Sequence, residues 1–408
     1  MSEMSYLEKL LDGVEVEWLP LGEVSALRRG RVMSKGYLTE NFGPYPVYSS
    51  QTANNGKIGS INTFDFDGEY ISWTTDGANA GTVFYRTGKF SITNVCGLIT
   101  LKNKYPLIYK FLFYWLTIEA KKHVYSGMGN PKLMSHQVEN IPVPVPCPDN
   151  PEKSLAIQSE IVRILDTFSA LTAELTAELT AELNMRKKQY NYYRDQLLSF
   201  NTEDVPHLPM GQKDIGEFIR GGTFQKKDFI DAGVGCIHYG QIYTYYGTYT
   251  EKTKTYISTA LAKKCKKAQK GDLIIATTSE NDEDVCKAVA WLGSEDIAVS
   301  SDACIYKHNL NPKYVSYFFQ TEQFQNQKRQ YITGAKVRRV NADNLSKILI
   351  PVPSMEIQER IVSILDKFDT LTNSITEGLP REIELRQKQY EYYRDLLFSF
   401  PKPETASN

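Results

Sequence analysis

Residues 157–168 read IQSEIVRILDTF, and residues 357–368 read IQERIVSILDKF. The match extends over 157–200 and 357–400 at a constant offset of 200 without a gap, and 24 of these 44 positions are identical. Chance does not produce such agreement, and an internal repeat indicates a duplicated structural unit. The chain has 408 residues, which is long for one domain and leaves room for two copies.

Apolar residues in the repeated segment follow the spacing of a coiled-coil seam. They recur at intervals of four and three residues, which places them on one face of a helix. The first seam comprises Ile157, Ile161, Ile164, Phe168, Leu171 and Leu175, and the second comprises Ile357, Ile361, Ile364, Phe368, Leu371 and Ile375. We expect the two seams to pair antiparallel with each other and to close the chain into a pseudo-twofold circular arrangement.

The first copy carries the unit Thr-Ala-Glu-Leu three times in tandem, over residues 172–183. Leu179 and Leu183 continue the apolar stripe, and each unit adds about 6 Å of helix. A simple low-complexity helix explains this pattern. Alternatively, the number of units would set the separation of the two globular regions that flank the helix. The second copy has Gly378-Leu379-Pro380 here, which interrupts a helix. Only the first copy is therefore expected to form a continuous rod.

Each repeat ends in a tyrosine-rich segment, Tyr-x-Tyr-Tyr-Arg-Asp. Aromatic rings beside arginine can stack on nucleic-acid bases, but the helical spacing and the flanking aspartates favour a core or protein–protein role. We predict binding to a partner subunit through Tyr190, Tyr193, Arg194, Tyr390, Tyr393 and Arg394.

A longer region with mixed α/β features precedes each helical segment. Residues 70–75 and 273–278 alternate like strands, whereas 107–120 and 314–327 have helical spacing. Both regions close with Ile-Pro-Val-Pro, and proline keeps the chain extended there. We predict an α+β fold, built as a tandem duplication of a globular mixed α/β domain followed by a long coiled-coil helix.

The predicted organisation has five parts: an N-terminal helical stub packing with the helical frame, a first head, a central helix, a second head, and a C-terminal helical region pairing with the central helix. Their boundaries are 1–18, 19–150, 151–200, 201–353 and 354–408. The heads share their layout but little identity. Divergence of this kind is expected if the heads read different ligands, although neutral drift of loops would also produce it.

Composition excludes several classes of function. The six cysteines form no Cys-x-x-Cys pair and the five histidines form no ligand motif, so no metal site is expected. Neither a Gly-x-Gly-x-x-Gly loop nor a P-loop is present. No stretch is apolar for long enough to span a bilayer, and the N-terminus lacks the basic region of a signal peptide. We therefore expect a cytoplasmic protein without a catalytic centre or cofactor of its own.

The net charge of −1 does not by itself indicate a nucleic-acid partner. Local basic clusters recur in both heads, however, beside polar side chains in glycine-containing segments. Arginine and lysine would hold phosphates there, while amide, hydroxyl and guanidinium groups would read base edges. When the two heads are compared, Tyr48-Ser49-Ser50-Gln51 of the first lies where the second has His238-Tyr239-Gly240-Gln241. The candidate DNA-binding residues are Arg28, Arg29, Arg31, Tyr48, Ser49, Ser50, Gln51, Thr74, Thr75, Lys132, Arg220, His238, Tyr239, Gln241, Thr277, Thr278, Lys336, Arg338 and Arg339.

The full chain resembles the specificity subunits of type I restriction–modification enzymes. The Thr-Ala-Glu-Leu tandem, the paired Ile-Gln…Ile-Val…Ile-Leu-Asp helices, the paired Tyr-Tyr-Arg-Asp ends and the Ile-Pro-Val-Pro closures carry the resemblance. The tandem is similar to the subgroup called type IC. The resemblance implies two target-recognition domains, each reading half of an asymmetric bipartite site in double-stranded DNA.

The resemblance also implies partners. Two modification subunits would bind the helices and transfer a methyl group from S-adenosylmethionine to adenine. Restriction subunits using ATP and Mg²⁺ would translocate and cleave unmethylated DNA. These cofactors are expected on the partners and not on this chain.

Two other classes of function remain as alternatives. The first is a non-catalytic coiled-coil scaffold whose two heads bind protein; specific retention on duplex DNA separates it from the DNA-reading role. The second is a self-sufficient nuclease or methyltransferase, which the missing motifs disfavour.

Overall fold

A computed structural model describes residues 6–402 except 128 and 375. The first five residues of the predicted stub, and Ile375 of the second predicted seam, therefore lie outside the described residues. The chain divides into two compact units: the first contains Met1–Thr176 and Leu385–Asn408, and the second contains Ala177–Glu384. Each unit thus combines one head with segments of both copies of the helical repeat.

The head of the first unit contains a six-stranded sheet in the order β2-β7-β5-β6-β3-β4. All neighbours are antiparallel except β3 and β6. Gly97 on β7 is required by packing, because a Cβ atom there would meet the ring of Trp73 at 2.1 Å. The strands are β2 (Ser25–Arg29), β3 (Phe42–Tyr48), β4 (Lys57–Ile61), β5 (Phe66–Thr74), β6 (Val83–Ile92) and β7 (Cys96–Leu101).

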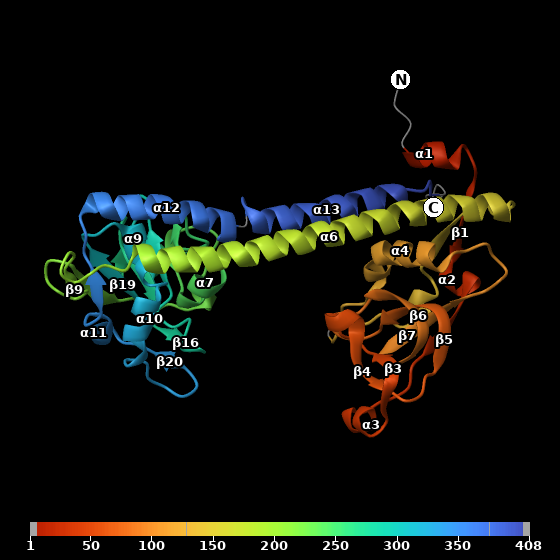
Figure 1. The fold of residues 1–408 in the computed structure, drawn as a ribbon, viewed down its shortest axis with the longest axis horizontal. Coiled ribbons are helices and arrows are strands. Elements are labelled where there is room, and N and C mark those ends of the chain that lie inside the picture. The colour runs from red at the N-terminus through yellow and green to blue at the C-terminus, as the bar shows by residue number, and fades with distance from the viewer. Residues whose placement is uncertain (1–5, 128, 375, 403–408) are drawn as a thin grey trace. The chain divides into compact units, whose positions relative to one another are not determined.

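One helix lies between this sheet and the frame. This is α4 (Tyr109–Glu119), whose apolar residues pack on the sheet and on the first part of α6 (Pro151–Leu197) (Figure 1). A separate two-stranded ladder joins β1 (Val16–Pro20) to β8 (Pro142–Pro146) and closes the head where it meets the frame. The remaining elements of the unit are α1 (Tyr6–Leu11), α2 (Leu21–Val24), α3 (Lys35–Glu40), η1 (Ala53–Gly56), η2 (Ala120–His123) and α5 (Ser135–Val138).

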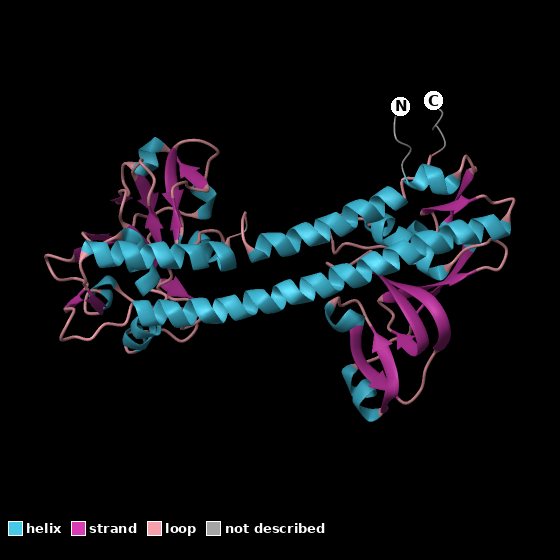
Figure 2. Cartoon of the chain, turned by 45° about the horizontal axis from the view of Figure 1, so that its top comes forward, coloured by secondary structure: helices cyan, strands magenta, loops and turns pink. Residues whose placement is uncertain are grey.

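The head of the second unit has two main sheets, drawn as magenta strands in Figure 2. A five-stranded sheet has the order β10-β19-β15-β17-β12, and a four-stranded sheet has the order β13-β11-β18-β14. Two short ladders, β16-β20 and β21-β9, complete the head. The strands are β9 (His207–Pro209), β10 (Gly216–Arg220), β11 (Val234–Ile237), β12 (Tyr249–Thr250), β13 (Thr255–Ile257), β14 (Lys267–Ala268), β15 (Leu273–Ala276), β16 (Thr278–Ser279), β17 (Ala288–Trp291), β18 (Ile297–Val299), β19 (Ala303–His308), β20 (Arg338–Arg339) and β21 (Leu349–Pro351).

In this unit α9 (Pro312–Phe318) takes the place that α4 has in the first, because it packs against both the sheet and α12 (Met355–Asn373). Asn311 caps α9 by accepting hydrogen bonds from two backbone amides, and proline follows at its first position. The other helices of the unit are η3 (Lys226–Asp228), α7 (Tyr239–Thr244), α8 (Thr259–Ala262), α10 (Glu322–Arg329) and α11 (Ala342–Leu345).

The helical repeat behaves differently in its two copies. Helix α6 runs for 47 residues without a break and includes all three Thr-Ala-Glu-Leu units. The second copy is divided into α12 and α13 (Leu379–Leu397). Gly378 precedes α13 with a φ of +79°, and a Cβ atom there would meet the carbonyl oxygen of Thr370 at 2.5 Å. The prediction of one continuous and one interrupted helix is confirmed.

The two helix copies contact each other, but they do not do so seam to seam as predicted. Ile157 and Ile161 lie in the core of the first unit, whereas Ile361 lies in the core of the second. Each seam packs on its own head and on the tyrosine-rich end of the other helix copy. The reason is that α4 and α9 offer each seam an apolar face, which the spacing of the seam alone did not reveal. Leu171 and Ile357 are exposed at the margin of this contact.

Candidate nucleic-acid interface

The Thr-Thr segments mark the same structural position in both heads. The amide of Thr75 donates to the carbonyl of Val95 (3.0 Å), and its own carbonyl accepts from Leu133 (2.9 Å). Thr277 repeats this pattern with Asp302 (2.9 Å) and Val340 (3.1 Å). Each segment therefore joins the sheet to a loop that follows the main helix of the head.

These threonines are mostly structural in their side chains. Thr74, Thr75 and Thr278 are buried, and only Thr277 is partly exposed. The hydroxyl of Thr277 donates to the carbonyl of Asp302 at 2.9 Å. The segments consequently position their neighbours, and three of the four predicted threonines do not present a side chain at the surface.

A basic residue stands next to each Thr-Thr segment. Lys132 forms backbone bridges with Asp76 and Tyr125, and Arg339 pairs with Thr278 in the β16-β20 ladder. Both side chains are exposed. Loops more than fifty residues away in sequence thus bring a cation to the same edge of each sheet.

A second basic residue reaches this edge from the first strand of each head's main sheet. Arg29 ends β2 and Arg220 ends β10, and a glycine follows each. Gly30 donates to the carbonyl of Cys96 (3.2 Å), and Gly221 donates to that of Ala303 (3.0 Å). A Cβ atom on either glycine would lie about 2 Å from a backbone oxygen of the neighbouring segment, at 2.2 and 2.1 Å respectively. Close backbone approach therefore fixes where the two arginines leave the sheet.

In the second head these residues surround one cavity of about 280 Å³. Arg220, Thr277, Thr278 and Arg339 all line it, so four predicted DNA-binding residues come together. Asn341, Asn344 and Tyr331 complete its polar wall, and sequence reasoning had not selected them. Two guanidinium groups beside amide donors and acceptors suit a phosphate or a base edge.

The Tyr48–Gln51 loop of the first head matches a segment of the second head that is shifted by one residue from the predicted one. The amide of Thr93 donates to the carbonyl of Tyr48 (2.9 Å), and that of Ser300 donates to the carbonyl of Ile237 (3.1 Å). Thr93 and Ser300 each lie two residues before the partner of the Thr-Thr segment. Tyr48 therefore corresponds to Ile237 and Ser49 to His238. The predicted correspondence of Tyr48 with His238 is wrong by one residue.

The side chains of these loops are largely engaged within the heads. Ser49 shares a hydrogen bond with Thr93 (2.8 Å), and Gln51 donates to the carbonyl of Lys57 (2.6 Å). Gln241 is buried and accepts from the amide of His238 at 2.9 Å. Burial lowers the pKa of His238 and so favours its neutral form. Ser50 and Tyr239 are partly exposed.

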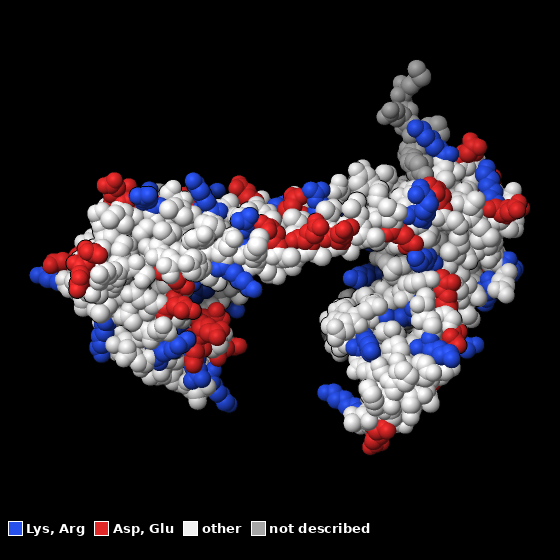
Figure 3. Space-filling model, in the orientation of Figure 1, with Lys and Arg blue, Asp and Glu red and all other residues white. Residues whose placement is uncertain are grey.

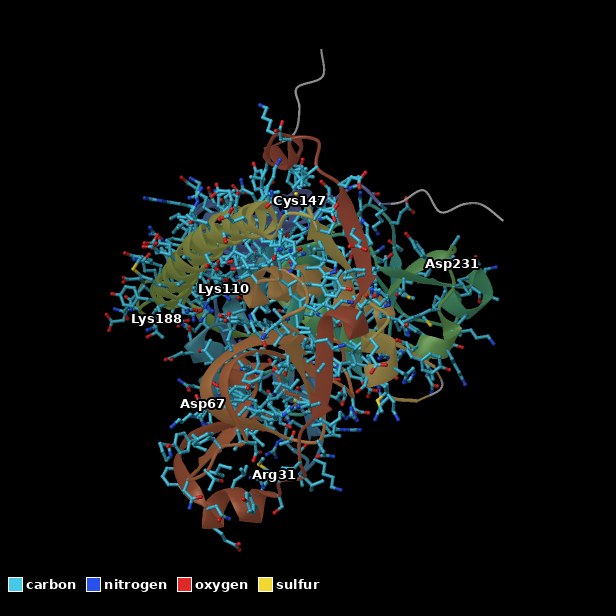
Figure 4. All side chains as sticks on the ribbon, turned by 90° about the vertical axis from the view of Figure 1, so that its right-hand side faces the viewer. Arg31, Asp67, Lys110, Cys147, Lys188 and Asp231 are labelled. Atoms are coloured by element: carbon cyan, nitrogen blue, oxygen red, sulfur yellow. The ribbon has the colours of Figure 1, made fainter. Side chains whose placement is uncertain are left out.

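Several other predicted cations also have partners. Arg31 pairs with Asp65 at 3.0 Å, and Arg338 pairs with Asp282 at 2.7 Å. Arg28 and Lys336 are exposed. Figure 4 places Arg31 at the end of its head that is remote from α6, whereas Lys110 lies beside that helix. Figure 3 shows acidic side chains interspersed with the basic ones on the visible face of each head, so no continuous basic field covers that face.

Sequence reasoning missed a buried cation in the first head. Arg86 on β6 donates to Ser72 Oγ (3.0 Å) and to the carbonyl of Asn55 (2.8 Å), and its guanidinium lies 3.6 Å from the centroid of the Tyr48 ring. Burial lowers the pKa of Arg86 to about 10. The contacts fix the turn at Asn54 and Asn55, which both have positive φ. A single arginine within an alternating strand gives no signal of this role.

The second head holds a buried cation of the same kind. Lys328 on α10 is fully buried and donates to the carbonyls of Glu283 (3.0 Å) and Val285 (2.8 Å). It therefore ties α10 to the loop that follows β16. Both heads thus use a buried cation to hold a loop next to the candidate interface.

The tyrosine-rich ends are divided between core and surface. Tyr190 is buried and donates to Gln320 at 2.9 Å, and Arg194 is buried beside Asp195 at 3.2 Å. Tyr390 accepts from Ser169 at 3.0 Å, and Arg394 pairs with Asp395 at 2.8 Å.

Tyr193 and Tyr393 remain exposed, as do Tyr192 and Tyr392, which had not been selected. A partner would therefore meet these four exposed rings before Tyr190, Arg194, Tyr390 or Arg394.

In the first unit, exposed Tyr393 lies in an apolar groove of about 450 Å³. Its walls come from α6 and α13 and include Ile164, Phe168, Leu396 and Leu397. Within the described part of the chain, no three His, Cys, Asp or Glu side chains gather as a metal site would require. None of the described helices has the length and apolar character needed to cross a membrane.

Comparison with known proteins gives a consistent result over the whole chain. The family model described as type I restriction modification DNA specificity domain matches residues 13–185 and again 209–385. The chain is 40% identical over 432 residues to the specificity subunit of the type I restriction enzyme EcoR124I/EcoR124II from Escherichia coli, and the match covers 100% of both chains. It is 36% identical over 409 residues to the EcoprrI specificity subunit from the same species, covering 92% of this chain and 93% of the relative.

A solved structure from work on assembly and conformational transition of the type I R-M system has a TM-score of 0.63 to this chain. It is 13% identical, and the match covers 94% of this chain and 98% of the other. At that identity the likeness concerns the fold alone.

Proposed function

The chain belongs to the type I restriction–modification DNA specificity family, and we propose that it reads a bipartite, asymmetric DNA site with one head on each half. The observation that carries this proposal is the repeated edge in the two heads. There the same backbone contacts hold an arginine, a Thr-Thr segment and a further cation in each head.

The side chains at equivalent positions differ, which supports separate half-sites. Lys132 in the first head stands where the second has Arg339, and Ser49 stands where the second has His238. Lysine presents a point charge, whereas arginine presents a planar fork suited to two acceptors at once. Heads with equivalent backbones and different donors are suited to different base sequences.

The same proposal assigns the chemistry to partner subunits. Two modification subunits would dock on the helical frame, with the exposed rings Tyr192, Tyr193, Tyr392 and Tyr393 among their contacts. Those subunits would bind S-adenosylmethionine, and restriction subunits would bind ATP and Mg²⁺. This chain would supply DNA recognition and a scaffold, and no catalytic group.

Sequencing of methylated adenines tests the proposal directly. The chain is expressed with its modification subunit in a genome that carries no other specificity subunit, and methylated sites are collected. We expect a single motif made of two different half-sites separated by a fixed number of unspecified base pairs. Two results would favour the scaffold alternative instead. One is methylation without any sequence preference, and the other is an absence of methylation together with firm binding of the heads to a protein.

A further inference from the structure

A carboxylate on α6 joins the frame to two side chains of the first head. Asp166 Oδ2 lies 2.7 Å from Lys110 Nζ, and Asp166 Oδ1 accepts a hydrogen bond from the Tyr114 hydroxyl at 2.7 Å. Lys110 and Tyr114 are one helical turn apart on α4, so both oxygens of a single carboxylate are bound by the same face of one helix. This arrangement restricts both sliding and rotation of α4 on α6.

A buried amide makes a second connection two turns earlier on α6. Gln158 Oε1 accepts from the amide of Ile108 at 3.0 Å, and its Nε2 donates to the carbonyl of Pro106 at 2.6 Å. These backbone groups lie at the start of α4, where a helix leaves its amides without internal partners. The two connections lie about 12 Å apart along α6. Two separated contacts fix an angle between helices, which one contact cannot do.

The second unit repeats the carboxylate connection and half of the glutamine connection, because the Nε2 group of Gln358 donates to the carbonyl of Pro353 and not to the start of α9. Asp366 Oδ2 lies 2.7 Å from Lys313 Nζ, and Asp366 Oδ1 accepts from the Tyr317 hydroxyl at 2.7 Å. Gln358 Oε1 accepts from the amide of Asn311 at 2.9 Å. The heads differ in most of their sequence, yet a lysine and a tyrosine contact the aspartate of the frame in both.

The stability of each unit does not depend mainly on these ion pairs. The side chains of Lys110 and Asp166 are 37% and 40% exposed and those of Lys313 and Asp366 are 21% and 26% exposed, and ion pairs that solvent reaches contribute little to folding free energy. Apolar cores hold each head on its helix, with Phe111 and Ile161 in the first unit and Tyr314 and Ile361 in the second. Apolar contact is non-directional, however, whereas the paired hydrogen bonds to one carboxylate are directional.

We propose that Asp166 and Asp366 are positioning residues that fix the angle of each head on its helix, and that they thereby restrict which spacer lengths the protein accepts between its half-sites. This inference rests on the proposed function, because it needs two DNA-reading heads. It extends that function by assigning spacer selectivity to two pairs of head–helix contacts as well as to helix length.

The test uses the full chain assembled with its modification subunits. Asp166→Asn and Asp366→Asn each replace one anionic acceptor by an amide, whose NH₂ group cannot accept from lysine or tyrosine. Tyr114→Phe is a milder variant that removes one hydrogen bond and keeps the ring in place. Glu152→Gln, an exposed carboxylate in the first turn of α6, is the matched control. Duplexes with the native half-sites and spacers one base pair shorter, equal or longer are compared for methylation rate.

We expect the wild type and Glu152→Gln to prefer one spacer strongly. The aspartate variants should keep both half-site sequences and their thermal midpoint, while the preference among spacers falls by about tenfold, a change of about 1.4 kcal/mol. The spacer preference of Tyr114→Phe should lie between that of the wild type and that of the aspartate variants. Unchanged spacer preference in all variants, with a specific wild type, overturns the inference alone. Altered half-site sequence also overturns it, since the aspartates would then act on readout. A wild type without sequence preference would instead refute the proposed function.

Discussion

The ring of Phe168 on α6 lies 5.7 Å from the ring of Tyr393 on α13. In the other unit Phe368 on α12 lies 5.7 Å from Tyr193 on α6, so the partners exchange roles. The seam of each helix copy therefore contacts the tyrosine-rich end of the other copy. This pairing explains why the two copies agree better at the ends of the repeat than in the middle, because the ends contact each other and the heads.

Deleting one Thr-Ala-Glu-Leu unit should shorten the preferred spacer by one or two base pairs. The tandem lies inside an unbroken helix, so the loss of four residues removes about 6 Å, compared with 3.4 Å per base pair. Sequencing of methylated adenines with the three-unit and two-unit forms measures the change. An unchanged spacer would show that the helix does not set the separation.

Replacing residues 21–140 with the head of another family member should change one half-site and leave the other as it was. The second head lies in its own unit with its own core, so its loops keep their arrangement. The methylated motif of the chimera is compared with those of both parents. A change in both half-sites would contradict the independence of the heads.

Arg339→Gln should weaken DNA binding and lower the salt dependence. The arginine is exposed at the cavity of the second head, where loss of one phosphate contact should reduce the slope of log K against log salt by about 1. Affinity is measured at several salt concentrations for the assembled complex. Lys213→Gln, at an exposed lysine outside that cavity, is the control and should leave the slope unchanged. An equal slope in both variants would remove Arg339 from the interface.

Gln158→Ala should destabilise the first unit by about 1–3 kcal/mol. The variant leaves the Ile108 amide and the Pro106 carbonyl without their partner in a buried site, which is the costly way to lose a hydrogen bond. Denaturant unfolding of the full chain measures the loss. Gln196→Ala, at an exposed position of α6, should change stability by less than about 0.5 kcal/mol. Equal effects would mean that water replaces the amide.

The second unit should lose stability as the pH falls from 6.5 to 4. Burial lowers the pKa of His308 from 6.5 to about 4, so in this range the unfolded chain binds a proton that the folded chain does not. The free energy of unfolding then decreases with falling pH, by at most about 3 kcal/mol from this group. His308→Gln should remove that contribution, whereas His136→Gln, at an exposed histidine in the first unit, should not. Denaturant midpoints at three pH values give the comparison, and parallel pH curves for wild type and His308→Gln would refute it.

The helical frame could be predicted largely from sequence because its evidence is local. The repeat, the Thr-Ala-Glu-Leu tandem and Gly378 are visible within short segments, and the structure has a continuous α6 and an interrupted second copy. The partner of each seam was not predictable in this way. Ile161 and Ile361 pack against helices some fifty residues away, and spacing indicates an apolar face without saying what covers it.

The candidate interface was predicted in part. Arg220 and Arg339 were selected for their chemistry, and the fold brings them to one cavity. Thr74 and Thr75 were selected because they end an alternating strand, but the same position buries them. Arg86 gave no signal because its importance comes from Ser72, Asn55 and Tyr48, which only the folded sheet places around it.

A continuous α6 also transmits twist. An α-helix turns once every 3.6 residues, so a four-residue unit adds one full turn and about 40° more. One base pair of B-DNA turns by about 34°, as 10–10.5 pairs complete a turn. Adding or removing a whole unit would therefore rotate the part of α6 beyond the tandem by only about 40° relative to the part before it. This rotation is close to the twist of one base pair. Inserting two residues instead would rotate that part of α6 by about 200°, toward the opposite side of the duplex. A tandem counted in fours suits a protein that changes its reach without losing its orientation.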